Sequence, residues 1–474
     1  MAIFLTRRLL RYTTLVGVVL FVVLTLSSNK DGSSYVSTYL PASLDFSSNG
    51  APQQDKLSTA EDLKEKEKVD AAKLLQEAKL EQDANSDVAF DADAKKVTTD
   101  AKAKEVAADA VAADSAAAPA AAPKKDTPAV VDSKLTKDTL EFLAPSFKNK
   151  GKRPKATFVS LVRNNELGPM LDAIKYVQRK FNDQFKYDWT FLNDEEFTDE
   201  FKTKVSAAIN ATVKFGKIPK EHWSYPDYIS LDKAAETREK MKNIIYGGSE
   251  SYRHMCRYQS GFFWRHPLLD DYDWYWRVEP STKLYCDIKY DVFQWMQDNE
   301  KAYGFTITIH EYEATIPTLW DTSKKFFKAH PEYIAKDNLM KFISDNGGEK
   351  YNLCHFWSNF EIGNLNLWRS PAYRDYFETL DRSGGFFYER WGDAPVHSIA
   401  ASVFLPKSYI HYFSDIGYHH PPYDNCPLDN KVWKENNCEC DQNNDFTFKG
   451  YACGRQYYDA AGIERPSYWE KYSH

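Results

Sequence analysis

Hydrophobic and polar positions divide this chain of 474 residues into regions with different patterns. An uncharged, largely apolar run covers residues 12–29. Residues 30–148 are rich in Ala, Lys, Asp and Glu, and they hold too little apolar bulk to offset the entropy of ordering them. From residue 149 to residue 474, short aromatic-rich runs alternate with segments of helical periodicity. We therefore predict a disordered or partly helical, low-complexity stalk followed by one large α/β domain.

The apolar run of residues 12–29 is close to the lower limit of about 17 residues for crossing a bilayer. Three arginines within residues 1–11 precede it, and such charge favours the cytosolic side. We expect a cytosolic tail over 1–11, a membrane anchor over 12–29 and a lumenal remainder, in single-pass type II topology. A cleaved signal peptide is the alternative, although the small-residue cleavage pattern is weak here.

The run from Tyr272 to Ser281 (Tyr-Asp-Trp-Tyr-Trp-Arg-Val-Glu-Pro-Ser) predicts a buried strand that ends at Glu279. Pro280 cannot donate to a sheet, so it should stop the strand. Ligands of open α/β sheets bind beyond the carboxyl ends of strands, and hard divalent cations take oxygen ligands. Glu279 is therefore a candidate ligand of a cation that holds a diphosphate. A helix N-cap region or a surface salt bridge is the alternative.

Other apolar runs predict the start of a nucleotide-binding sheet. Residues 156–162 and 187–192 should form strands, and the spacing within 167–181 predicts a helix between them. The sequence has no GxGxxG and no P-loop, which argues against dinucleotide enzymes and P-loop phosphotransferases. Residues 303–309 predict another strand, and the run 351–362 follows.

Three further polar residues are candidates for chemistry. Glu361 ends the apolar run 351–362, where a carboxylate is either a paired structural acid or a catalytic one. Asp393 precedes an apolar helix over 399–405, and its alternative role is helix capping. His420 lies beside prolines in what we expect to be a loop, where a metal ligand and an ordinary surface histidine are both possible.

The seven cysteines fall into a C-terminal cluster and three isolated positions. The cluster is Cys426, Cys438, Cys440 and Cys453, and the isolated residues are Cys256, Cys286 and Cys354. A lumenal location permits disulfides, so we predict two bridges within the cluster rather than a four-cysteine zinc site. Because the total is odd, at least one thiol should be free or paired with another chain.

The net charge of −7 is acidic and gives no sign of the basic surface that binds nucleic acid. Asn210-Ala211-Thr212 is the one N-glycosylation sequon and should be exposed if it is used.

Five stretches resemble the fungal Golgi α-1,2-mannosyltransferases of glycosyltransferase family 15. They are Tyr252 to Tyr258 (Tyr-Arg-His-Met-Cys-Arg-Tyr), Tyr275 to Pro280 (Tyr-Trp-Arg-Val-Glu-Pro), Tyr351 to Glu361, Glu389 to Asp393 (Glu-Arg-Trp-Gly-Asp) and Gly417 to Pro422 (Gly-Tyr-His-His-Pro-Pro). The resemblance runs from about residue 145 to the C-terminus and includes the type II layout with a stalk. It implies a GT-A-like fold with a mixed central sheet, and a Golgi membrane location with the catalytic domain in the lumen.

The resemblance also implies an activity. Mannose would be transferred from GDP-mannose, with retention at the anomeric carbon and with Mn²⁺ as cofactor. The acceptors would be mannose-terminated O-linked chains and outer N-glycan branches of glycoproteins.

On the matching positions, the resemblance assigns metal binding to Glu279 and His420, together with the donor diphosphate. Many relatives have Asp two positions after the glutamate, but this chain has Ser281. A second carboxylate ligand is therefore missing, which leaves more of the metal binding to the other two residues and the phosphates.

The same resemblance assigns the remaining roles. Tyr252 would lie against the phosphate and the transferred sugar, and Arg163 would help to bind the nucleotide. Glu361 would sit near the anomeric carbon, and Asp393 would contribute at the sugar and acceptor site.

Two mechanisms of retention stay open. Glu361 either attacks in a double displacement or only stabilises an oxocarbenium-like centre during front-face return. From the residues alone, a glycoside hydrolase and a mannose-binding lectin are the competing functions.

Overall fold

The computed structural model describes residues 138–473. The predicted cytosolic tail, the anchor and most of the predicted stalk lie outside these residues. Within the described part of the chain, no helix is both long and apolar enough to cross a membrane.

The core is a seven-stranded sheet with the order β10-β6-β9-β4-β1-β2-β3. Its strands are β1 (Ala156–Leu161), β2 (Asp188–Asn193), β3 (Val213–Lys217), β4 (Trp274–Arg277), β6 (Tyr303–Phe305), β9 (Ile362–Asn364) and β10 (Ile410–Tyr412). Strand β1 pairs in parallel with β2 and β4, and β10 pairs in parallel with β6. Strand β9 is antiparallel to both of its neighbours, β4 and β6. The predicted mixed central sheet is confirmed.

The first βαβ unit forms as its pattern predicts. Helix α4 (Leu167–Val177) follows β1, continues into a π-helical turn over Gln178–Asn182, and buries one apolar face. Beneath it, Phe158 of β1 stacks on Trp189 of β2 at 4.6 Å and contacts Trp276 of β4 at 5.4 Å. These rings are at most 1 % exposed. Such aromatic pairs add to the apolar area that the layer removes from water.

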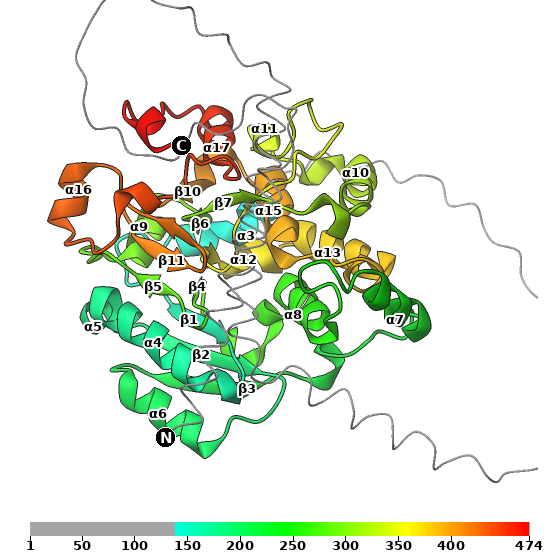
Figure 1. Cartoon of the computed structure of the whole chain (residues 1–474), viewed down its shortest axis with the longest axis horizontal. Helices are drawn as coiled ribbons and strands as arrows, with labels where there is room; N and C mark the ends of the chain where they lie inside the picture. Colours follow the sequence, from blue (N-terminus) through cyan, green and yellow to red (C-terminus); the bar gives the residue numbers. More distant parts are fainter. Residues whose placement is uncertain (1–137, 474) are drawn as a thin grey trace, which may run out of the picture. The chain divides into compact units, whose positions relative to one another are not determined.

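Helices cover both sides of the sheet (Figure 1). In that view α4 and α6 (Asp199–Ala208) lie on one side of β1–β3, and α8 (Glu250–Gly261) and α13 (Pro371–Ser383) lie on the other. Helix α15 (Asp393–Phe404) packs against α8 and α13. The other helices are α5 (Asp183–Phe185), α7 (Leu231–Lys240), α9 (Val292–Asp298), α10 (Leu319–Ala329), α11 (Met340–Ile343), α12 (Leu365–Arg369), α14 (Gly385–Tyr388), α16 (Asn430–Glu435) and α17 (Gly454–Ala461).

The folded part begins earlier than the sequence suggests. Helix α3 (Asp138–Phe147) falls in the range assigned to the stalk, yet Leu143 is fully buried and Phe147 lies 6.3 Å from the Trp274 ring. One short helix after a long polar segment gives little periodic signal. Residues 138–147 therefore belong with the folded domain.

Two predicted segments are divided by turns. The run 303–309 is not one strand, because the chain leaves the central sheet after β6 and forms β7 (Thr308–His310). Strand β7 pairs with β8 (Cys354–Phe356) in a separate two-stranded sheet. A second turn then separates β8 from β9, and Glu361 lies immediately before β9. The pattern of residues 303–309 does not reveal the first turn, because Thr306 and Ile307 are buried as well.

The prediction that His420 lies in a loop is wrong. His419 and His420 lie on strand β11 (Tyr418–His420). Strand β11 lies between β12 (Tyr423–Asn425) and β5 (Lys283–Leu284) in a three-stranded antiparallel sheet. The two prolines that suggested a loop form the hairpin turn.

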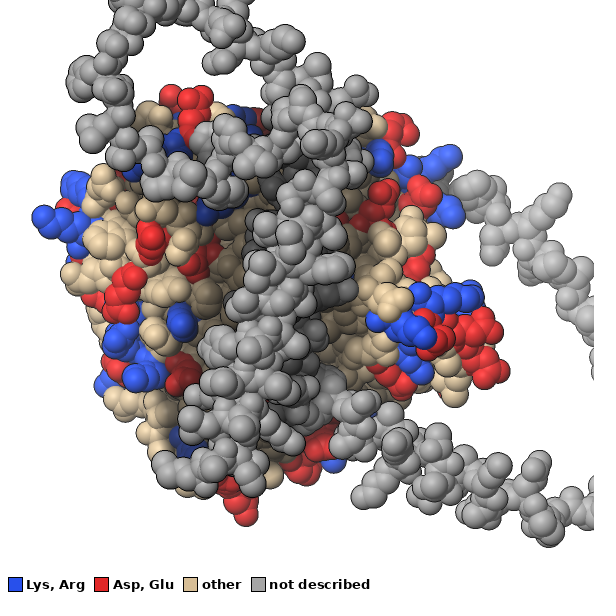
Figure 2. Space-filling view, viewed as in Figure 1, with Lys and Arg blue, Asp and Glu red and all other residues tan. Residues whose placement is uncertain are grey.

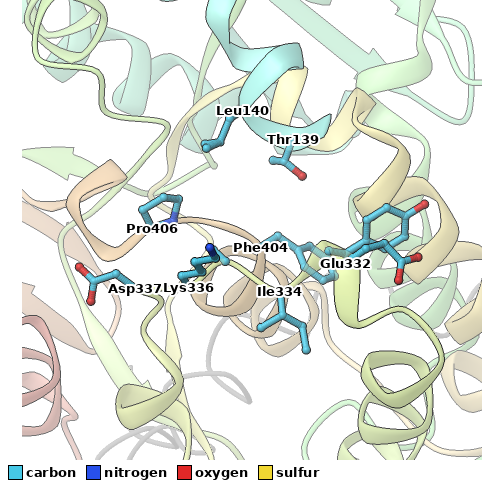
Figure 3. Close-up of a pocket in the computed structure, with 10 residues that line it drawn as sticks. Thr139, Leu140, Glu332, Ile334, Lys336, Asp337, Phe404 and Pro406 are labelled. Atoms are coloured by element: carbon cyan, nitrogen blue, oxygen red, sulfur yellow. The ribbon is translucent and has the colours of Figure 1, made fainter. Parts of the chain in front are cut away.

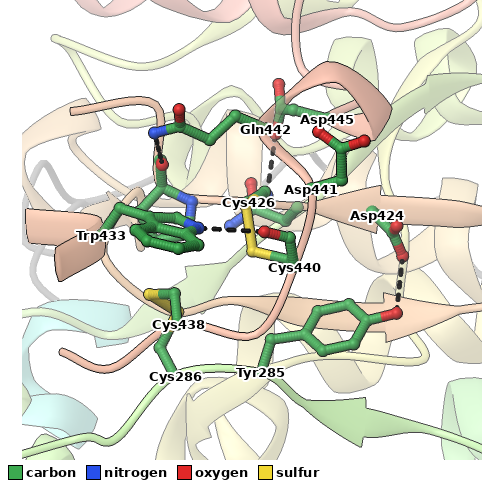
Figure 4. The surroundings of a disulfide bond; sticks show 12 residues. Tyr285, Cys286, Asp424, Cys426, Trp433, Cys438, Cys440, Asp441, Gln442 and Asp445 are labelled. Carbon is green, nitrogen blue, oxygen red and sulfur yellow. Dashed lines mark hydrogen bonds between the residues drawn. A yellow bond between two sulfur atoms is a disulfide. The ribbon is translucent and has the colours of Figure 1, made fainter. Parts of the chain in front are cut away.

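Three disulfides join described residues: Cys354–Cys453, and the pairs Cys286–Cys438 and Cys426–Cys440 that Figure 4 shows. Cys256 is free and buried, as the odd count requires. The prediction of two bridges within the C-terminal cluster is wrong, because two of its cysteines pair with distant partners. Connectivity depends on which strands meet, and β5 next to β11 brings Cys286 to the cluster. The bridges attach the segment that carries His420 to the rest of the fold.

Acidic and basic side chains are mixed on the visible face (Figure 2). Helix α7 shows this well, since Glu236 pairs with Lys240 at 3.5 Å. Exposed pairs of this kind contribute little to stability.

Candidate active site

Glu279 and His420 come together although 140 positions separate them. Glu279 follows the carboxyl end of β4, and His420 ends β11. Glu279 Oε2 lies 3.4 Å from His420 Nε2, and both side chains are 25 % exposed. The His420 ring packs edge-on against Trp357, with ring centroids 4.7 Å apart. One carboxylate oxygen and one imidazole nitrogen, both accessible and adjacent, form a donor set that suits a divalent transition metal.

A buried arginine holds the acids of this region in place. Arg277 Nε donates to Glu279 Oε1 at 2.8 Å, and Arg277 Nη1 donates to Asp393 Oδ2 at 2.5 Å. Ser358 also donates to Asp393 Oδ2, at 2.7 Å. Burial opposes the ionisation of Glu279, but Arg277 and His420 lower its pKa to about 2. Glu279 is therefore a carboxylate over the whole physiological range and can bind a cation.

Glu361 lies deeper than Glu279. The β4–β9 register places its backbone carbonyl against the Arg277 amide, at 2.9 Å. Its side chain is 1 % exposed, and Oε2 accepts a 2.9 Å hydrogen bond from Tyr303. His397 Nδ1 is 3.1 Å from the same oxygen. Glu361 is thus a buried acid with hydrogen-bond partners, and its charge acts on Arg277, the arginine that holds Glu279 and Asp393.

Tyr252 lies on α8 at the same site. Its hydroxyl is 3.3 Å from Nη1 of Arg390, and Nη2 of that arginine pairs with Glu311 at 3.3 Å. Burial raises the pKa of Tyr252 well above its ordinary value, so the hydroxyl stays protonated. Tyr246 stacks on the outer face of this ring at 4.3 Å.

Arg163 and Asn210 occupy different parts of the fold. Arg163 follows β1, at the same sheet edge as Glu279, and its backbone N–H donates to Glu166 Oε2 at 2.8 Å. Burial raises the pKa of Glu166, and the charges of both Arg163 and Glu279 act on it. Asn210 is exposed between α6 and β3, away from these acids.

The structure thus brings together Glu279, His420, Glu361, Asp393 and Tyr252, with Arg163 at the neighbouring strand end. Sequence reasoning missed their partners: Arg277, Tyr303, Glu311, Ser358, Arg390 and His397. Three of these, Arg277, Ser358 and Arg390, stand within the stretches already singled out, and that position was an available signal.

A cavity of about 290 Å³ opens elsewhere (Figure 3). It is lined by Thr139 and Leu140 of α3, by residues 332–337, and by Phe404 and Pro406. None of the candidate site residues lines this cavity, so it is separate from the candidate active site.

A family model described as glycolipid 2-alpha-mannosyltransferase matches residues 113–462. The chain belongs to this family. A glycolipid 2-alpha-mannosyltransferase of Saccharomyces cerevisiae is 57 % identical over 476 residues, which cover 100 % of both chains. The alpha-1,2 mannosyltransferase KTR1 of the same yeast is 60 % identical over 68 % of this chain and 82 % of its own length.

Solved structures of relatives share the fold. Core-mannan synthase A from Aspergillus fumigatus, in its Mn/GDP form, is 41 % identical, with a TM-score of 0.62 over 66 % of this chain and 86 % of its own. The mannosyltransferase Ktr4p from S. cerevisiae, in complex with GDP, is 34 % identical, with a TM-score of 0.61 over 74 % of this chain and 96 % of its own. The chain is therefore a glycosyltransferase with α-1,2-mannosyltransferase activity and a GT-A-like mixed α/β fold.

Proposed function

We propose that the enzyme transfers mannose from GDP-mannose, in a Mn²⁺-dependent reaction that retains the anomeric configuration. The acceptors are mannose-terminated O-linked and N-linked glycans of glycoproteins, and the enzyme works in the Golgi lumen. One observation carries the proposal: Glu279 and His420, 3.4 Å apart, stand beside the buried acids Glu361 and Asp393. The Mn/GDP form of one relative and the GDP complex of another support the choice of cofactor and donor.

Glu279 and His420 are the residues that would hold Mn²⁺, and their oxygen and nitrogen donors fit this ion. The ion supplies Lewis-acid stabilisation of the departing diphosphate. Arg277 keeps the Glu279 carboxylate oriented, since it donates to the oxygen that does not face His420. In this proposal Arg163, at the neighbouring strand end, helps to bind the nucleotide, and Tyr252, beside Arg390, binds the phosphate.

Glu361 stabilises the positive charge that develops at the anomeric carbon. Its side chain is enclosed, with Oε2 held by Tyr303, so we infer that it acts through its charge. In this front-face route the leaving phosphate accepts the proton of the acceptor hydroxyl. Asp393, fixed by Arg277 and Ser358, binds the hydroxyls of the sugar and the acceptor. A mannosyl adduct trapped on Glu361 would instead establish double displacement.

Thermal unfolding with ligands tests the donor and the cofactor. GDP and Mn²⁺ together should raise Tm by more than the sum of their separate effects, because each completes the site of the other. At about a hundred times Kd, a ligand adds about 2.7 kcal/mol. A hydrolase would release mannose without a nucleotide, and a lectin would bind glycan without turnover. The absence of any joint effect contradicts the proposal.

The region before the catalytic domain should anchor and localise the enzyme without taking part in the chemistry. A truncated form that begins at Lys134 keeps α3 and should be soluble and fully active. A form that begins at residue 149 loses the fully buried Leu143, worth about 1.5–3 kcal/mol, and the half-buried Phe147 that packs against the core. Its Tm should fall by several degrees. Equal Tm values would contradict the packing role of α3, and an inactive but folded Lys134 form would contradict the stalk assignment.

Ser281 offers a gain-of-function test of the metal site. It has a φ of 65°, a left-handed conformation that Asp and Asn adopt more readily than most residues. Ser281→Asp should therefore fold normally and keep activity, and it should lower the Mn²⁺ concentration for half-maximal rate about two- to tenfold. Ser281→Asn, which has the same shape without the charge, is the control. A weaker response to Mn²⁺ in the Asp variant would contradict the placement of the ion.

A further inference from the structure

His397 is a fully buried histidine that contacts oxygen atoms at both ring nitrogens. Nδ1 lies 3.1 Å from Glu361 Oε2, and Nε2 lies 3.2 Å from the backbone carbonyl oxygen of Gln259. The carbonyl can only accept, so Nε2 carries a hydrogen. A proton must then also lie between Nδ1 and Oε2, because two bare acceptors would repel each other at this distance. The His397–Glu361 pair therefore holds one shared proton in a site with 0 % and 1 % exposure.

The surroundings favour placing that proton on the ring. Trp368 stacks on the imidazole with ring centroids 4.3 Å apart, and the face of an indole attracts a cation. Tyr303 donates to the same Glu361 oxygen at 2.9 Å, which stabilises the carboxylate form. An imidazolium and a carboxylate also neutralise each other, as a buried charge requires.

The other titratable groups around the pair come from three elements. Tyr275 and Arg277 belong to β4, Tyr303 to β6 and Tyr373 to α13, and the charge of Glu361 acts on all four. Burial raises the pKa of each tyrosine well above its ordinary value, so none of the three supplies a charge. His397 and Arg277 are then the cations that face Glu361.

We propose that His397 is a positioning residue of the transfer reaction: as an imidazolium tethered to the Gln259 carbonyl, it fixes the Glu361 side chain and keeps its carboxylate ionised. This rests on the proposed role of Glu361. Helix α15 carries Asp393 and His397 four residues apart, hence on one face. The same helix thus carries one of the two acids, Asp393, and holds the other, Glu361, through His397.

The protonation state can be measured without any activity assay. In the full-length protein labelled with ¹⁵N-histidine, the NMR signals of His397, assigned by their loss in His397→Gln, should show a hydrogen on both nitrogens. In Glu361→Gln the ring should become neutral. A neutral His397 ring in the wild-type protein would overturn the proposal, whether or not the enzyme uses GDP-mannose.

Kinetics then test the positioning role. His397→Gln keeps an N–H donor but removes the charge, so the Glu361 carboxyl should protonate at higher pH. The acid limb of the kcat profile should move to higher pH by about one unit, and maximal kcat should fall about 10- to 100-fold with little change in KM for GDP-mannose. Tyr303→Phe removes a hydrogen bond to Glu361 but keeps the His397 imidazolium, so it should shift the acid limb of the kcat profile less than His397→Gln does.

His266→Gln is the matched control. His266 is also buried with a carbonyl partner, but that partner is Lys217 at the end of β3, and β3 lies three strands from β4 in the sheet. This variant should lose stability only. If His397→Gln likewise lowers Tm and leaves the pH profile unchanged, His397 is merely structural and the proposal fails. If Glu361→Gln itself retains normal kcat, the role of Glu361 is wrong, and the positioning role falls with it.

Discussion

Replacement of Glu361 by glutamine should lower kcat by at least about 10²-fold, while KM for GDP-mannose changes little. Removal of one preorganised group that stabilises transition-state charge in other enzymes costs 10²–10³-fold. Glu361 is 1 % exposed, so its charge acts in a region with little water to screen it. An effect on kcat without an effect on KM marks an interaction made in the transition state rather than in substrate binding.

A structural role for Glu361 predicts a different result, namely lost stability with normal kcat in the folded fraction. Tm and kcat should therefore be measured on one preparation. Asp445→Asn is a matched control, because Asp445 is also fully buried and accepts hydrogen bonds from the backbone of Cys426 and Thr447, neither of which contacts Glu361. It should lower Tm and leave kcat within about twofold. A stable Glu361→Gln enzyme with near-normal kcat would remove Glu361 from the mechanism.

Much of the sheet could be predicted from local pattern. Strands β1 and β2 and the helix between them follow from periodicity, and β4 stops before Pro280, although it ends at Arg277 rather than at the predicted Glu279. The run 303–309, predicted as one strand, contains a buried turn at residues 306–307, where burial continues while the backbone changes direction. The disulfides show the same limit, since Cys354 meets Cys453 only through tertiary contact.

The candidate site could also be predicted only in part. Glu279 and Glu361 could be singled out because each ends an apolar run, where a carboxylate needs a partner. Their partners could not be identified, because the β4–β9 register sets Arg277 beside Glu361, and the packing of α15 brings His397 to it. In the sequence His397 is one polar residue at the start of an apolar helix, and nothing local distinguishes it.

Metal dependence should follow Glu279 and His420. Glu279→Gln keeps the shape but removes the charge, and His420→Ala removes the nitrogen donor. Loss of a residue that only hydrogen-bonds to a metal ligand typically weakens metal binding 10- to 100-fold. Loss of the ligand itself should therefore weaken it at least as much. Both variants should need at least about tenfold more Mn²⁺ for half-maximal activity, and Glu279→Gln should also bind GDP-mannose more weakly.

His419→Ala is the control that the fold itself offers. His419 and His420 are neighbours on β11 with similar exposure, 20 % and 25 %, but successive strand residues point to opposite faces. His419 faces Asp424 at 2.6 Å, whereas His420 faces Glu279. His419→Ala should leave the Mn²⁺ titration unchanged. If His419→Ala raised the Mn²⁺ requirement as much as His420→Ala, the effect would be a general disturbance of the hairpin. If Glu279→Gln and His420→Ala both gave wild-type titrations, these residues would not be the ligands.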